Sequence, residues 1–116
     1  MTAAGFRRVV LKLDGAMEGS HMGHPDFRLN GRIFATLHQG GKTGMVKVSP
    51  DQQEELVHER PDVFAPESGA WGRQGCTRVH LAHADEEVIG AALTLAWQQA
   101  AAVPPKPRRR AKRSAS

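Results

Sequence analysis

The sequence has a single cysteine, no tyrosine and no run of about 18 apolar residues. One cysteine, Cys76, excludes an internal disulfide framework and is typical of a protein from a reducing cytoplasm. We expect it to be a small, partly buried strand residue. The first residues lack the apolar segment and cleavage site of a secretory signal. We therefore expect a cytoplasmic protein with no membrane span and no membrane partner.

Acidic residues are missing from the last thirteen positions. Residues 104–116 hold six of the 16 Lys and Arg side chains, which leaves 10 basic and all 12 acidic side chains in residues 1–103. The sequence pI of about 9.8 therefore reflects the tail and not the body. A segment rich in Pro and Arg cannot build a core. We predict one domain at 1–103 and a disordered basic tail at 104–116.

Three helices are predicted in this domain. Apolar residues recur at helical spacing over 2–14 and over 85–101. A third helix starts with an N-cap at Ser49, followed by proline in the first turn. It ends by Arg60, because Pro61 disfavours helical geometry in the residue before it.

Short apolar runs between turn residues predict strands. Asn30-Gly31 is the strongest short-range hairpin signal. The strands that can be placed are 27–29, 32–38, 43–48 and 76–82, and residues 63–75 are typical of a long loop. The expected order is α-β-β-β-β-α-β-α. It predicts an α+β fold in which an antiparallel sheet of about five strands has helices packed on one face.

Strand alternation predicts which side chains share a face of the sheet. Ile33, Ala35 and Leu37 point one way, toward the helices. The opposite face then gathers Arg32, Phe34, His38, Arg78 and His80, together with Lys47. This face is either an ordinary solvated surface or a docking surface, with cations for phosphates and an aromatic ring for stacking.

The stretch from Gly23 to Ala35, GHPDFRLNGRIFA, resembles the hallmark of the MmcQ/YjbR-like family of small bacterial proteins. Farther along, Trp71-Gly72 resembles the Trp-Gly loop of that family, and the likeness spans about residues 5–100. The resemblance implies a compact YjbR-like α+β fold with a proposed double-wing DNA-binding arrangement. It implies no catalytic residues.

No catalytic or metal-binding set of residues can be assigned from spacing. The sequence has neither a phosphate-binding P-loop nor the context of a nucleophile elbow. His21 and His24, like His80 and His83, have H-x-x-H spacing but lack the further ligands that zinc requires. We expect His24 to hydrogen-bond within its own hairpin. The protein is therefore expected to be no enzyme and to hold no metal or cofactor.

Salt-sensitive DNA binding is the function that these observations favour. Cations of the hairpins and loops would contact phosphates, while the tail adds nonspecific affinity or serves only as a solubilising terminus. The predicted contacts are Arg28, Arg32, Lys42, Lys47, Arg73 and Arg78 in the domain and Arg108, Arg109, Arg110, Lys112 and Arg113 in the tail. We expect the protein to act as a monomer.

Two other functions remain open at this point. The exposed sheet face or an edge strand could dock a protein partner, which a near-neutral domain favours. Alternatively, His24, Phe34 and Trp71 could form a small-ligand pocket. Trp71 itself either stacks on a base or ligand or covers the edge of the core.

Overall fold

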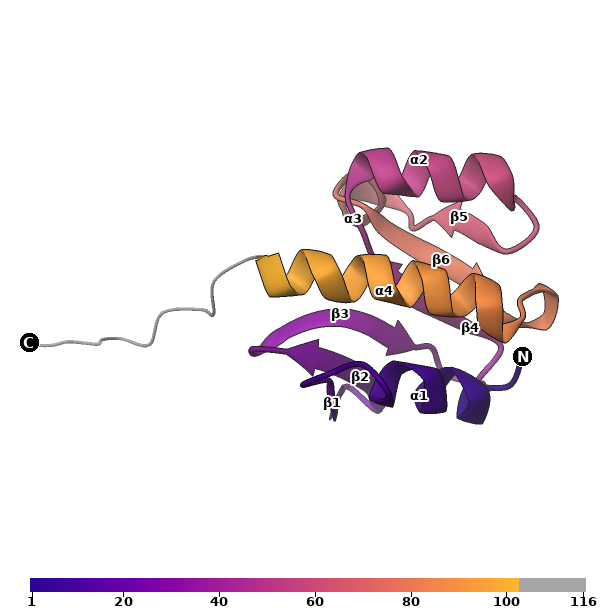
Figure 1. The fold of residues 1–116 in the computed structure, drawn as a ribbon. Coiled ribbons are helices and arrows are strands. Elements are labelled where there is room, and N and C mark those ends of the chain that lie inside the picture. Colours follow the sequence, from indigo (N-terminus) through magenta and orange to yellow (C-terminus); the bar gives the residue numbers. More distant parts are fainter. Residues whose placement is uncertain (103–116) are drawn as a thin grey trace, which may run out of the picture.

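Two tight hairpins join the first three strands of the sheet. The computed structural model describes residues 1–102 (Figure 1). Helix α1 (Ala3–Leu11) is followed by β1 (Met17–His21), β2 (His24–Leu29) and β3 (Arg32–Leu37). Both residues of each turn, Met22-Gly23 and Asn30-Gly31, have positive φ. Such two-residue turns match the twist of antiparallel strands, and the predicted Asn-Gly hairpin is confirmed.

The second part of the chain alternates strands and helices. It forms β4 (Thr43–Lys47), α2 (Pro50–Glu59), β5 (Phe64–Pro66), α3 (Gly69–Arg73), β6 (Cys76–His80), the 3-10 turn η1 (Leu81–His83) and α4 (Glu86–Ala102). Helix α2 begins with the predicted capping box. The backbone N–H of Gln52 donates to Ser49 Oγ at 3.1 Å, and that of Ser49 donates to Gln52 Oε1 at 3.0 Å. These bonds satisfy backbone donors that the first turn leaves unpaired.

The strands form one antiparallel sheet in the order β1-β2-β3-β4-β6-β5. Helix α4 packs across β2, β3 and β4, α1 packs against α4, and α2 lies against β5 (Figure 1). The core between these layers includes the fully buried side chains Phe6, Phe27, Val46, Val79, Ile89 and Leu93. The predicted α+β architecture is confirmed.

The strand count and the loop at 63–75 differ from the sequence prediction. The sheet has six strands instead of about five, and residues 63–75 contain β5 and α3 instead of a continuous loop. Both elements are too short, at three and five residues, to show a repeating apolar pattern. β2 also reaches back to His24, because this residue pairs with His21 across the first turn. The predicted tail at 104–116 lies outside the described residues.

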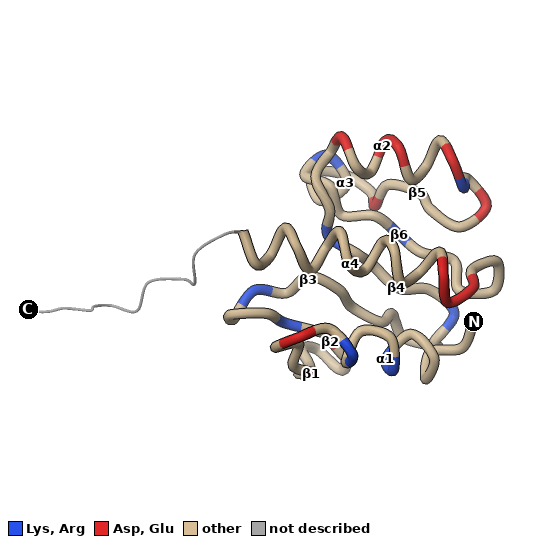
Figure 2. Tube along the Cα trace, in the orientation of Figure 1, with Lys and Arg blue, Asp and Glu red and all other residues tan. Residues whose placement is uncertain are grey.

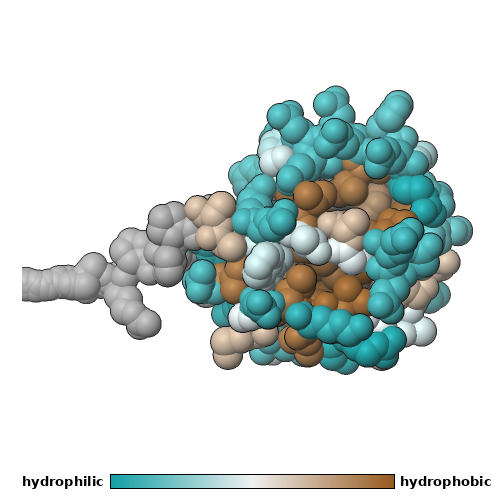
Figure 3. Space-filling model, viewed as in Figure 1, coloured by the Kyte–Doolittle hydropathy of each residue, from teal (hydrophilic) through white to brown (hydrophobic). Residues whose placement is uncertain are grey.

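After its first turn, which contains Glu86 and Glu87, helix α4 is uncharged. No Lys, Arg, Asp or Glu occurs between Val88 and Ala102. Figure 3 shows apolar side chains at the surface along this face of the molecule, surrounded by polar ones. Over residues 1–102, no helix combines the length and apolar character that crossing a membrane requires. Along this stretch, α4 therefore offers no charged side chain to a ligand.

Two glycines hold the segment around α3 close to its neighbours. A Cβ atom at Gly72 would overlap the carbonyl oxygen of Glu67, and one at Gly75 would overlap the carbonyl oxygen of Val48. Gly75 also has a φ of +105°, which side chains rarely adopt. Only glycine allows these backbone approaches. They explain the glycines of the Trp-Gly loop in physical terms.

We predict that Gly72→Ala lowers the free energy of unfolding by about 2–4 kcal/mol, because the backbone around Glu67 must move. Gly90→Ala is the matched control. Its added Cβ would meet nothing within 4 Å in the middle of α4, so it should stabilise the protein by about 0.4–1 kcal/mol. Urea denaturation measures both, and equal stability of the two variants would contradict this packing.

Candidate functional site

A groove of about 730 Å³ opens on the sheet face opposite the core-facing side chains of Ala35, Leu37 and Val46. Its described lining includes three cations (Arg28, Arg32, Lys47), three histidines (His21, His24, His38), the carboxylate of Glu67, and the side chains of Ile33, Phe34, Met45, Trp71 and Cys76. Ala96, Gln99 and Ala100 of α4 also line it.

The groove lies where the two halves of the sheet separate. β3 and β4 pair only through Ala35 with Val46, Thr36 with Met45, and Leu37 with Gly44. Beyond Ala35 and Val46 no further pair joins these strands, and side chains near the end of α4 line the opening. The two halves of the sheet are β1-β2-β3 and β4-β6-β5.

A buried carboxylate holds the groove residues of the first half. Asp26 is fully buried and accepts hydrogen bonds from Arg28 Nε at 2.8 Å and from Arg28 Nη2 at 3.0 Å. His21 Nδ1 lies 2.8 Å from Oδ2 of the same carboxylate. The Arg28 hydrogen bond, opposed by burial and helped by His21, lowers the pKa of Asp26 below its ordinary value of 3.8. Asp26 therefore stays ionised and fixes the Arg28 guanidinium at the groove.

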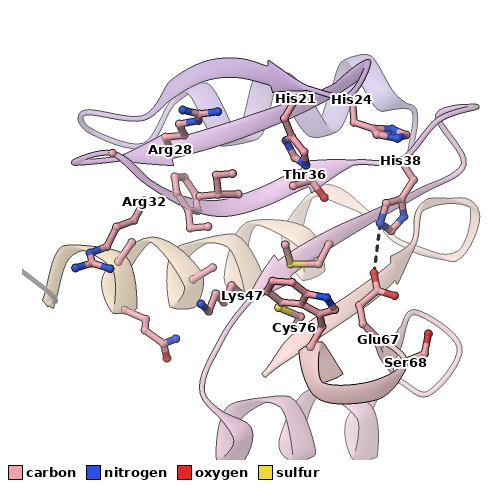
Figure 4. A pocket seen from close by; sticks show the side chains of 18 residues that line it. His21, His24, Arg28, Arg32, Thr36, His38, Lys47, Glu67, Ser68 and Cys76 are labelled. Carbon is pink, nitrogen blue, oxygen red and sulfur yellow. Dashed lines mark ion pairs between the residues drawn. The ribbon is translucent and has the colours of Figure 1, made fainter. Parts of the chain in front are cut away.

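A second carboxylate, that of Glu67 after β5 in the other half of the sheet, contacts Arg78 and His38. Glu67 Oε1 accepts hydrogen bonds from Arg78 at 2.8 and 3.1 Å, and Oε2 lies 3.3 Å from His38 Nε2 (Figure 4). Burial lowers the pKa of His38, although Glu67 opposes this shift. A neutral imidazole satisfies both of its contacts, with Nε2–H toward Glu67 and Nδ1 accepting from the Thr43 hydroxyl at 2.8 Å. At neutral pH His38 adds no charge to the groove.

The charged groups are not spread evenly along the groove. Figure 4 shows Arg28, Arg32 and Lys47 toward one end and His24, His38 and Glu67 toward the other. The end of α4 lies at the cationic end. Elsewhere, acidic residues gather along α2, which lies apart from the groove (Figure 2). The net negative charge of residues 1–103 is therefore compatible with a cationic groove.

The two aromatic residues that line the groove, Trp71 and Phe34, differ in solvent exposure. Trp71 is 67% exposed, whereas Phe34 is 1% exposed and belongs to the core. The expectation that Phe34 offers a ring on the open face is wrong. The pairing of β2 with β3 shifts register between Phe27 and Arg28, and this shift interrupts the regular alternation of β3 side chains between the two faces of the sheet. Trp71 therefore supplies the exposed ring.

His24 also departs from expectation. Its Nδ1 atom is buried and has no hydrogen-bond partner in the described structure. The ring instead lies 6.3 Å, between centroids, from that of His21 across the hairpin. No group of three His, Cys, Asp or Glu side chains within residues 1–102 is arranged to hold a metal ion. His24 thus lines the groove with one buried ring nitrogen that has no partner in the described structure.

The structure brings together some of the predicted contact residues and separates others. Arg28, Arg32 and Lys47 line the groove with His24, Phe34 and Trp71. Lys42, Arg73 and Arg78 are not among the lining residues. Arg78 instead donates a hydrogen bond to Glu67, which does line the groove. The tail cations Arg108, Arg109, Arg110, Lys112 and Arg113 lie outside the described residues.

Sequence reasoning missed His21, Met45, Glu67 and the end of α4 as groove residues. His21 could have been found, since a two-residue turn makes the two histidines of H-x-x-H direct cross-strand partners. Glu67 could not, because the short β5 and α3 that bring it to the groove left no pattern.

These features define a small α+β domain with a partly cationic groove between the two halves of its sheet. A family model described as YjbR matches residues 11–99, and the chain belongs to the YjbR family. The crystal structure of the Deinococcus radiodurans protein DR2400, with a DUF419 domain, has a TM-score of 0.71 at 21% identity, covering 84% of this chain and 77% of that one. This likeness shows the fold. No match was found among curated proteins.

We predict that Asp26 makes stability depend on acid pH. A lowered pKa means that its contribution is present above the ordinary value of 3.8 and is lost as pH falls through the folded-state value. Asp26→Asn should lower the melting temperature at about pH 7. Below about pH 4, the melting temperature of this variant should decrease less steeply with falling pH than that of the wild type. Glu54→Gln, an exposed carboxylate on α2, is the control. Parallel pH profiles of the two variants would refute this role of Asp26.

Proposed function

We propose that this protein binds DNA through the groove, with Arg28, Arg32 and Lys47 contacting phosphates, and that it acts as a binding protein and not as an enzyme. The observation that carries the proposal is the gathering of these three cations at one end of a single groove, beside an exposed indole. Charge-assisted hydrogen bonds to phosphate oxygens are the usual source of DNA affinity.

The arrangement of charge supports this proposal better than its total does. The acids nearest to the groove, Asp26 and Glu67, are engaged by Arg28 and Arg78. Lys47 forms no ion pair with any residue of the described chain. An incoming phosphate therefore meets net positive charge at this end of the groove.

The last described helix, which precedes the basic tail in the sequence, ends close to the groove. Gln99 and Ala100 line the groove, and the described helix ends two residues later, at Ala102. Only a short stretch of chain therefore joins the groove to the basic residues of 104–116. Two weak sites joined in one chain bind more tightly than either alone, because the second contact becomes intramolecular.

We predict that Lys47→Gln weakens DNA binding by a protein that ends at Val103, and makes the slope of log affinity against log salt shallower by about 1. Lys47→Arg should keep the slope. Arg8→Gln removes one charge from an exposed residue of α1, which does not line the groove, and should leave affinity nearly unchanged. Fluorescence anisotropy between about 50 and 200 mM salt measures all three.

The truncated protein is suitable for this measurement, because every core residue of the described chain lies between Phe6 and Ala100. Absence of salt-sensitive binding in it would leave the tail as the interacting segment and would refute a DNA role for the groove. A discrete protein partner that stays bound in high salt would favour the protein-interaction alternative instead.

A small-ligand pocket is the second candidate, and the presence of His24, Phe34 and Trp71 in the lining of one groove favours it. The groove volume of about 730 Å³ falls in the range of small-molecule sites, about 300–1,000 Å³. We predict that a ligand found by thermal-shift screening stabilises the wild-type protein but not His24→Ala. Equal stabilisation of both would place the ligand elsewhere.

A further inference from the structure

We infer that the groove binds single-stranded nucleic acid in preference to duplex, with one base stacked on the indole of Trp71. This inference rests on the DNA-binding role proposed above and specifies the form of the DNA. Three observations support it: the exposure of Trp71, the position of the cations inside a groove, and the presence of both cationic and apolar side chains in the lining.

Trp71 is held in place by its backbone while its ring stays open to solvent. It lies in α3, where the carbonyl oxygen of the next residue, Gly72, accepts a hydrogen bond from Gln53 Nε2 at 2.9 Å. Gly72 also fits against Glu67 so closely that no Cβ is tolerated. The indole is nevertheless 67% exposed and takes part in neither of the two ring contacts of the described chain, Phe6–Phe27 and His21–His24.

An exposed indole on a fixed backbone is suited to stacking. A nucleobase can stack on the indole with little loss of protein conformational entropy, because the backbone of Trp71 is already held in position. In a duplex the bases stack on one another and present only their edges in the grooves. An unpaired base is free to stack on the ring, and this preference for single strands needs no particular base.

The shape of the site favours the same form of nucleic acid. Duplex DNA is read by protruding elements, because a helix or a β ribbon has to enter a major groove about 12 Å wide. Here the cations line a groove between the two halves of the sheet, and Lys47 stands near the position where β3 and β4 part. One extended strand can enter such a groove and bring its phosphates to Arg28, Arg32 and Lys47.

The chemistry of the lining matches a nucleotide chain. Met45, Trp71 and Cys76 give apolar contact for bases, and the cation Lys47 lies beside them as the cross-strand partner of Cys76. The arrangement resembles the general design of single-strand binding sites, in which a positive track for the backbone runs beside stacking platforms.

Trp71 itself reports on binding. The other tryptophan, Trp97, lies on α4 outside the groove lining, and its Nε1–H donates to the carbonyl oxygen of Asp14 at 2.7 Å. Trp97→Phe therefore gives a full-length protein whose tryptophan emission comes from Trp71 alone. The probes are a thymidine oligonucleotide of about 12 nucleotides, within the site sizes of compact single-strand binding domains, and a duplex of the same length. Salt of about 200 mM suppresses weak contacts from the tail.

The single strand should quench Trp71 emission and bind at least about tenfold more tightly than the duplex. Trp71→Ala should weaken single-strand binding by about tenfold to a hundredfold and leave duplex binding unchanged. Trp71→Phe should restore part of the loss, and Trp97→Phe should bind like the wild type. Because the Trp71 ring is exposed, Trp71→Ala and Trp71→Phe should melt close to the wild-type temperature.

Equal affinity for the two forms, or single-strand binding that Trp71→Ala leaves intact, would overturn the inference while the proposed DNA role stands. If neither form binds once the Lys and Arg residues of the tail are replaced by Ser, the proposed role of the groove fails as well.

Discussion

Backbone pairing between β3 and β4 is the constraint on which the rest of the site depends. The two halves of the sheet share only three residue pairs there, ending at Ala35 and Val46. Farther along, Val48 donates to the carbonyl oxygen of Gly75 at 3.2 Å, so the chain turns toward the α3 segment instead of continuing beside β3. A fully paired sheet would close this opening. The early end of pairing creates the groove and exposes its lining.

Each half of the sheet places one carboxylate beside this opening, and each carboxylate engages an arginine and a histidine. Asp26 holds Arg28 and His21, and Glu67 holds Arg78 and His38. These clusters fix side-chain positions and cancel much of the charge that they bring together. Lys47 forms no ion pair with any residue of the described chain, and it therefore adds positive charge that these two clusters do not cancel. The number of cations in the sequence therefore overstates the positive charge that a phosphate encounters at the groove.

Much of the fold follows from local sequence signals, and less of the site does. The Asn30-Gly31 turn and the Ser49 cap were predictable because a few adjacent residues determine each of them. The groove depends on where β3 and β4 stop pairing, which involves residues far apart in the chain. Phe34 shows the difference, since it is the extra residue of β3 at a register shift against Phe27 and Arg28, and its ring is buried where simple alternation places it on the open face.

The most direct test of the account is an NMR titration of the isotopically labelled protein with single-stranded DNA, which follows backbone amides and the Trp71 indole N–H. Binding in the groove predicts that the largest shifts occur at Arg32, Lys47 and the Trp71 indole, while amides of α1 hardly move. Shifts confined to residues 103–116, or centred on α1 and α2, would contradict the claim that the groove is the binding site.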